Sequence, residues 1–106
     1  MATYFARIMD AQTGGEGAYE FEAADDLMGR TGDEIVNTFF DAVDHDVLHD
    51  HADWELNGVV NSRERRIVTA IGALIPKKNE PPIPFMLMIS DRDLPQLWTA
   101  EATNDV

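Results

Sequence analysis

One stretch decides the fold that this sequence predicts: residues 31–47, which read TGDEIVNTFFDAVDHDV. Thr31 precedes Glu34 by three residues, the spacing of a capping box. In that motif the threonine hydroxyl accepts a hydrogen bond from the glutamate backbone N–H, and the glutamate reaches back. Asp33 and Glu34 also place negative charge at the positive end of a helix dipole. The stretch therefore predicts a helix that begins here.

The apolar residues of this helix fall on one side and the polar residues on the other. At about 100° per residue, the apolar residues fill one continuous arc that we expect to face the core. Its members are Ile35, Val36, Phe39, Phe40, Val43 and Val47. Asp41, His45 and His49 follow one another at intervals of four residues on the opposite side. We expect that stripe to face away from the core.

Strand patterns lie on both sides of the helix in the sequence. They cover residues 3–9, 19–23, 53–61, 65–75 and 83–90. The glycine-rich segment at 13–17 separates the first two, which predicts a hairpin. Leu94, Leu97 and Trp98 have the spacing of a short C-terminal helix.

This order of elements predicts an α+β fold that forms a single domain over residues 1–106. We expect a largely antiparallel sheet, built from a hairpin, one long helix and a three-strand meander, and packed on the helix. A short C-terminal helix follows the last strand.

Two further signals lie in the strands that follow the helix. Alternation places Trp54, Leu56 and Val60 on one face of the first of these strands. Gly72 lies inside the next strand, where a residue without a side chain predicts a bulge or a close backbone approach.

Several strands are apolar on both faces, although one helix covers only one face of a sheet. The residues that would remain in water include Phe5, Val68, Leu74, Met86 and Met88. Such a patch is larger than monomeric proteins usually expose. We therefore expect a homodimer, in which the C-terminal tail and a second copy of the chain cover the second face.

The net charge of −12 arises almost entirely from one part of the chain. Residues 10–55 hold 14 acidic residues and one base, Arg30, whereas residues 56–106 hold six of each. An acidic surface repels phosphate, so we expect no nucleic-acid partner. No apolar run reaches the roughly 18–20 residues that cross a bilayer, so we expect no membrane partner. The absence of cysteine favours a cytoplasmic setting.

All three histidines lie within residues 44–53, among four aspartates. His45 and His49 stand one helical turn apart, with Asp41 one turn earlier, which is a spacing that can bind a divalent metal such as zinc or nickel. The same residues are also explained by a helix end that is exposed to solvent, because protonated imidazoles interact favourably with the helix dipole at that end. A pH-responsive surface is a further reading. No other cofactor is expected.

The sequence favours binding over catalysis. Ser62 and Ser90 are its only serines, and neither lies in a nucleophile elbow. The segment at 14–17 lacks the lysine and the hydroxyl residue of a phosphate loop. The charge distribution instead predicts a small interaction or regulatory protein.

We expect that protein to offer an acidic helix face to a basic protein partner. The face consists of Asp41, Asp44, His45 and His49. Two alternatives stay open. One is a divalent-metal-binding protein that uses His45, His49 and the nearby aspartates, and the other is a small enzyme with a pocket at a dimer interface.

Overall fold

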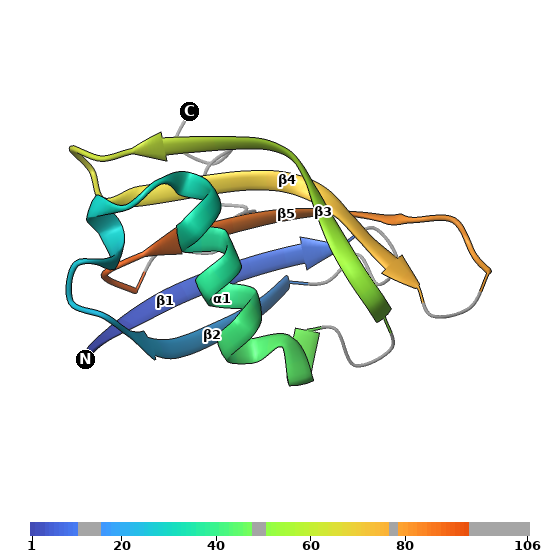
Figure 1. Ribbon diagram of the computed structural model, residues 1–106, viewed down its shortest axis with the longest axis horizontal. Coiled ribbons are helices and arrows are strands. Elements are labelled where there is room, and N and C mark those ends of the chain that lie inside the picture. Colours follow the sequence, from blue (N-terminus) through green and yellow to red (C-terminus); the bar gives the residue numbers. More distant parts are fainter. Residues whose placement is uncertain (11–15, 48–50, 77–78, 94–106) are drawn as a thin grey trace, which may run out of the picture.

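A computed structural model describes residues 1–10, 16–47, 51–76 and 79–93. They form a five-stranded sheet with one α-helix across one of its faces (Figure 1). All paired strands are antiparallel, in the order β2-β1-β5-β4-β3. Along the chain the elements are β1 (Ala2–Asp10), β2 (Glu16–Ala23), the 3-10 helix η1 (Leu27–Gly29), α1 (Gly32–Val47), β3 (His51–Ser62), β4 (Ile67–Pro76) and β5 (Ile83–Ser90).

The predicted α+β class is confirmed: the sheet is one layer and α1 is the other. The hairpin of β1 and β2 is continuous with the later strands, because β1 pairs with β5 along six residue positions. The expected short C-terminal helix at Leu94, Leu97 and Trp98 lies outside the described residues. Within the described part of the chain, no helix is long and apolar enough to cross a membrane.

The threonine half of the predicted capping box forms at the start of α1, and Glu34 reaches back to the Thr31 hydroxyl instead of its backbone N–H. The Glu34 backbone N–H donates to the Thr31 Oγ1 at 3.2 Å. In return, the Thr31 hydroxyl donates to the Glu34 Oε1 at 3.3 Å. The Asn61 Nδ2 donates to the Arg30 carbonyl oxygen at 3.0 Å, which ties the loop before α1 to the end of β3. Local sequence and one long-range hydrogen bond thus fix where the helix begins.

The core lies between α1 and the sheet. The predicted apolar arc is buried at Ile35, Val36, Phe39, Phe40 and Val43, the members whose side chains are described. They meet inward-facing side chains of the strands. Those include Tyr4, Ala6, Ile8, Phe21, Val68, Ala70, Leu74, Phe85, Leu87 and Ile89. Each large side chain buried in this way contributes about 1.5–3 kcal/mol to folding.

β3 contains a β-bulge near its middle. Leu56 pairs with Gly72, but the next residue in register with β4 is Gly58, which pairs with Ile71. Asn57 is therefore an extra residue on β3. One extra residue reverses the alternation of side chains beyond it.

The bulge changes which β3 residues face the core. Trp54 and Leu56 lie before it and pack against the core, as expected. Beyond it, Val59 packs against the core, whereas Val60 is 64% exposed. The prediction that Val60 shares a face with Trp54 and Leu56 is therefore wrong, because it assumed an unbroken alternation.

Candidate functional site

The outer side of α1 carries exposed carboxylates. Asp33, Glu34 and Asp41 are exposed, whereas Phe40 is buried next to Asp41 in sequence. Successive helical residues point about 100° apart, which separates the two. Asp41 thus stands on the surface beside one of the main core contacts of the helix.

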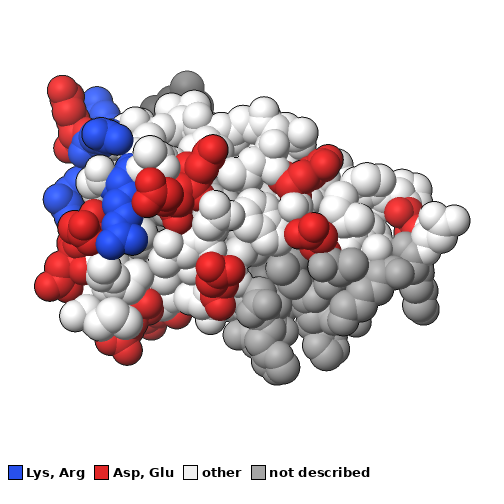
Figure 2. Space-filling model, viewed as in Figure 1, with Lys and Arg blue, Asp and Glu red and all other residues white. Residues whose placement is uncertain are grey.

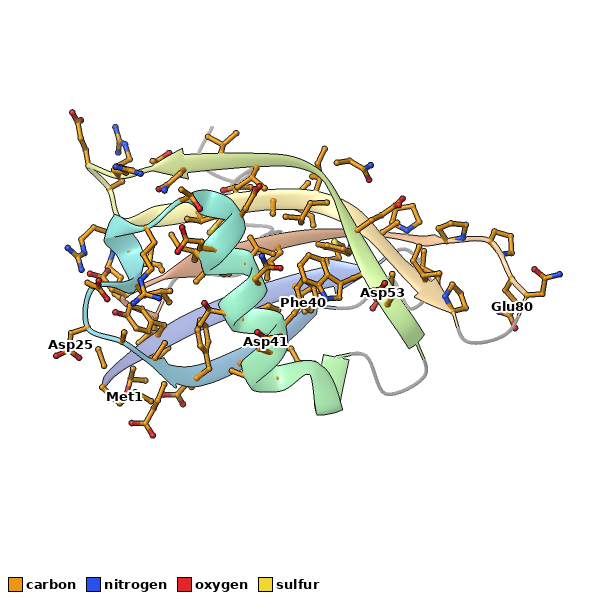
Figure 3. The ribbon with its side chains drawn as sticks, in the orientation of Figure 1. Met1, Asp25, Phe40, Asp41, Asp53 and Glu80 are labelled. Carbon is orange, nitrogen blue, oxygen red and sulfur yellow. The ribbon has the colours of Figure 1, made fainter. Side chains whose placement is uncertain are left out.

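An aromatic stack joins the second half of α1 to β3. The ring centroids of Phe40 and Trp54 are 4.3 Å apart, and the rings are inclined by 20°. The Trp54 backbone N–H donates to the Asp53 Oδ1 at 2.8 Å, which holds this carboxylate next to the stack. Figure 3 shows Asp41 on α1 and Asp53 on β3, with Phe40 lying between them in this view. We call Asp41 and Asp53 the acidic helix side.

Positive charge is separated from the acidic helix side. Figure 2 shows the Lys and Arg of this view at the end of the molecule where the loop before α1 and the β3–β4 turn lie, with Asp and Glu among them, and scattered Asp and Glu along the rest of this view. At that end the Arg30 Nη2 lies 3.0 Å from the Asp26 Oδ1. Within the described ranges, no ion pair involves Asp41 or Asp53. Their negative charge is therefore not neutralised by a described cation.

The predicted acidic helix face is placed only in part. Asp41 is exposed, as the helical projection predicts. Asp44 and His45 belong to the last turn of α1, but their side chains lie outside the described part, and His49 lies outside it altogether. Among the residues that are described, no three His, Cys, Asp or Glu side chains are grouped so that they could hold a metal ion. The metal site of His45, His49 and Asp41 stays a prediction.

Zinc titration tests that metal site. If the two imidazoles share one ion, the native protein is expected to bind Zn²⁺ at least about tenfold more tightly than a His45→Ala/His49→Ala variant. A His51→Ala variant keeps both proposed ligands and is the matched control. Isothermal titration calorimetry measures all three proteins. Matching isotherms for the native protein and the double variant would exclude the site.

A hollow of about 190 Å³ opens against β1 and β2. Its lining includes Arg7, whose Nη2 lies 3.5 Å from the Asp93 Oδ1, together with Tyr19 and Glu20. Pockets that bind small molecules usually enclose about 300–1,000 Å³. This hollow is smaller than that, and the alternative of a small enzyme with a pocket at a dimer interface stays a prediction.

The sequence did not reveal that the exposed Asp53 lies next to the stack of Phe40 and Trp54, where β3 meets α1. Alternation identifies Asp53 only as part of the connection into the Trp54 strand. The approach of β3 to α1 depends on the contact between Phe40 and Trp54, which no local pattern encodes. The only sequence signal for this contact was that Phe40 and Trp54 were both expected at core-facing positions.

Comparisons with known proteins return no match: no protein-family model, no curated protein and no solved structure is similar to this chain. We therefore argue its function from its residues and their arrangement alone.

Proposed function

We propose that this chain is a small interaction or regulatory protein that binds a basic partner through the acidic helix side. The observation that supports this most is the exposure of Asp41 on α1 and of Asp53 near the start of β3, where the stack of Phe40 and Trp54 joins the two elements, without an ion pair from a described residue. Carboxylates of this kind attract a cationic partner and steer its approach. The partly buried Trp54 beside Asp53 adds an aromatic anchor, a common feature of binding surfaces.

The proposal includes a homodimer and a cytoplasmic place of action. The cysteine-free composition supports the second point, because no disulfide contributes to the fold. Asp44, His45 and His49 extend the proposed face along the helix, as the sequence predicts.

Two charge-matched variants test whether the acidic helix side binds. The Asp41→Asn/Asp53→Asn variant and the Glu20→Gln/Glu22→Gln variant each change the net charge from −12 to −10. Glu20 and Glu22 are also exposed, but they lie on β2. A labelled oligolysine peptide is titrated into each protein, and binding is followed by fluorescence anisotropy. We expect the aspartate variant to bind several-fold more weakly than the native protein, and the glutamate variant to bind nearly as well.

Salt gives the second arm of this experiment. Attraction between exposed charges weakens as the Debye length falls from about 30 Å at 0.01 M salt to about 8 Å at 0.15 M. The native protein is therefore expected to lose affinity with added salt more steeply than the aspartate variant. If both charge-matched variants bound the peptide with equally reduced affinity, binding would depend on net charge alone, and the proposal would fail.

A further inference from the structure

The face of the sheet opposite α1 is apolar across four strands; we call it the outer face. The strand register aligns its side chains in rows, because directly paired residues point to the same face. One row consists of Met9, Met86, Ile71 and Gly58. The next consists of Arg7, Met88, Thr69 and Val60. The apolar residues of these rows form one continuous patch from β1 to β3.

The β3–β4 part of this patch is open to solvent. Val60 is 64% exposed and Ile71 is 49% exposed, and apart from Met1 these are the large apolar side chains that stand out of the described surface. They occupy diagonal positions on neighbouring strands, since Ile71 pairs with Gly58 and Val60 pairs with Thr69. Gly58 has no side chain to cover Ile71. The β3–β4 part of the outer face therefore exposes two large apolar side chains side by side.

The β-bulge creates this exposure. If Asn57 held a regular, paired position in the ladder, β3 would direct Val60 toward the core, where full burial of a valine contributes about 1.5 kcal/mol or more. The bulge instead moves Val60 beside Ile71 on the outer face. A feature that removes an apolar side chain from the core and adds it to a surface patch indicates a use for that surface.

Charged side chains and the bulge make the edges of the sheet poor sites of association. β2 forms one edge and carries the exposed Glu20 and Glu22, which point to the outer face, bound the apolar patch on that side and oppose pairing with another acidic strand. β3 forms the other edge, and its bulge interrupts the regular ladder that an added strand needs. Association through the outer face is therefore favoured over strand addition.

We propose that the outer face binds a second copy of this chain, sheet against sheet, about a two-fold axis. The four strands of the patch, about 4.8 Å apart and about eight residues long, present roughly 500 Å². Two copies would bury about 1,000 Å² in total, the lower end of the range for specific interfaces. Two such faces pack as the layers of a sandwich do, with their strands nearly aligned.

Charge determines the orientation of the second copy. Glu55 is exposed near the start of β3 on an outer-face position, and Arg63 and Arg65 are exposed in the turn beyond its end. No side-chain ion pair or hydrogen bond of either arginine occurs within the described ranges. If the two β3 strands run antiparallel, the acidic end of each faces the basic end of the other. A two-fold axis along the strands would instead place β3 of each copy over β2 of the other, so contact between Glu55 and these arginines is specific to the antiparallel arrangement, which we propose.

Light scattering coupled to size exclusion tests the interface. The native protein is expected at twice the 11.9 kDa chain mass, and Ile71→Glu at the mass of one chain. Ala42→Glu adds the same charge at an exposed position of α1 and is expected to stay dimeric. If Ile71→Glu fails to fold by circular dichroism, Val60→Glu, at the more exposed position, takes its place. A monomeric native protein, or a dimeric folded variant at either position, would overturn the proposal.

A charge swap tests the orientation. Glu55→Arg and Arg65→Glu are each expected to weaken the dimer several-fold, and the double variant is expected to restore it, because the two positions face each other across the antiparallel interface. Sedimentation equilibrium gives the dissociation constants. Failure of the double variant to recover affinity would rule out the antiparallel arrangement. These variants leave Asp41 and Asp53 intact. The oligolysine experiment therefore tests the proposed binding of a basic partner, and the light-scattering and charge-swap experiments test the dimer independently of it.

Discussion

Gly72→Ala is expected to lower the free energy of unfolding by about 3 kcal/mol, the upper part of the range for overpacked sites. A Cβ atom at this position would overlap the carbonyl oxygen of Glu55 and would lie 2.9 Å from the Phe85 Cζ. The first neighbour is backbone, which cannot move without shifting β3. The sequence predicted a bulge or a close backbone approach here, and the close approach is confirmed.

Gly29→Ala is the control for Gly72→Ala. A Cβ atom on Gly29 would meet nothing within 4 Å. This change is expected to leave stability unaltered or to raise it by less than about 1 kcal/mol, through the lower entropy of the unfolded chain. Urea unfolding, followed by circular dichroism at one fixed protein concentration, compares both variants with the native protein. If Gly72→Ala were as stable as Gly29→Ala, the backbone of β3 at Glu55 could not lie as close to Gly72 as the structure places it.

Phe40→Ala is expected to cost about 4 kcal/mol, because it removes the side chain through which α1 contacts both β3 and β5. Phe40 is 1% exposed. Its ring centroid lies 4.3 Å from that of Trp54, 5.1 Å from that of Phe39 and 5.6 Å from that of Phe85. A domain of this size has a total stability of about 5–15 kcal/mol, so this single change removes a large share of it.

Two further variants separate the packing of Phe40 from general effects on the helix. Phe40→Leu keeps an apolar side chain and is expected to cost about 1.5 kcal/mol. Asn37→Ala changes an exposed residue of the same helix and is expected to alter stability by less than about 0.5 kcal/mol. The same urea series measures both. A cost for Phe40→Ala near that of Asn37→Ala would contradict the stacked arrangement of Phe40 and Trp54.

The helix could be predicted from the sequence because its signals are local. Thr31 and Glu34 form the cap, and the buried arc from Ile35 to Val43 follows the helical period. The strands could also be recognised, and the expected hairpin of β1 and β2 forms. These features depend on neighbours within a few residues or on one hairpin, where sequence patterns carry most information.

The face that Val60 occupies could not be predicted, because alternation alone does not show a bulge. Gly58 and Gly72 are the traces that the bulge leaves in the sequence, and only Gly72 was interpreted in that way. The closeness of α1 to β3 is likewise a tertiary outcome, so Asp53 was not assigned to the acidic helix side. The three histidines lie at positions whose side chains are outside the described part, and their chemistry stays a prediction.

The register of β3 against β4 is the central claim, because the outer face and the proposed dimer both depend on it. Cross-strand nuclear Overhauser effects measure this register directly. The bulge predicts contacts that link the backbone protons of Val60 with those of Thr69, and of Gly58 with those of Ile71. A ladder without the bulge would instead pair Val60 with Val68. Observation of that second pattern would return Val60 to the core-facing side and contradict the account.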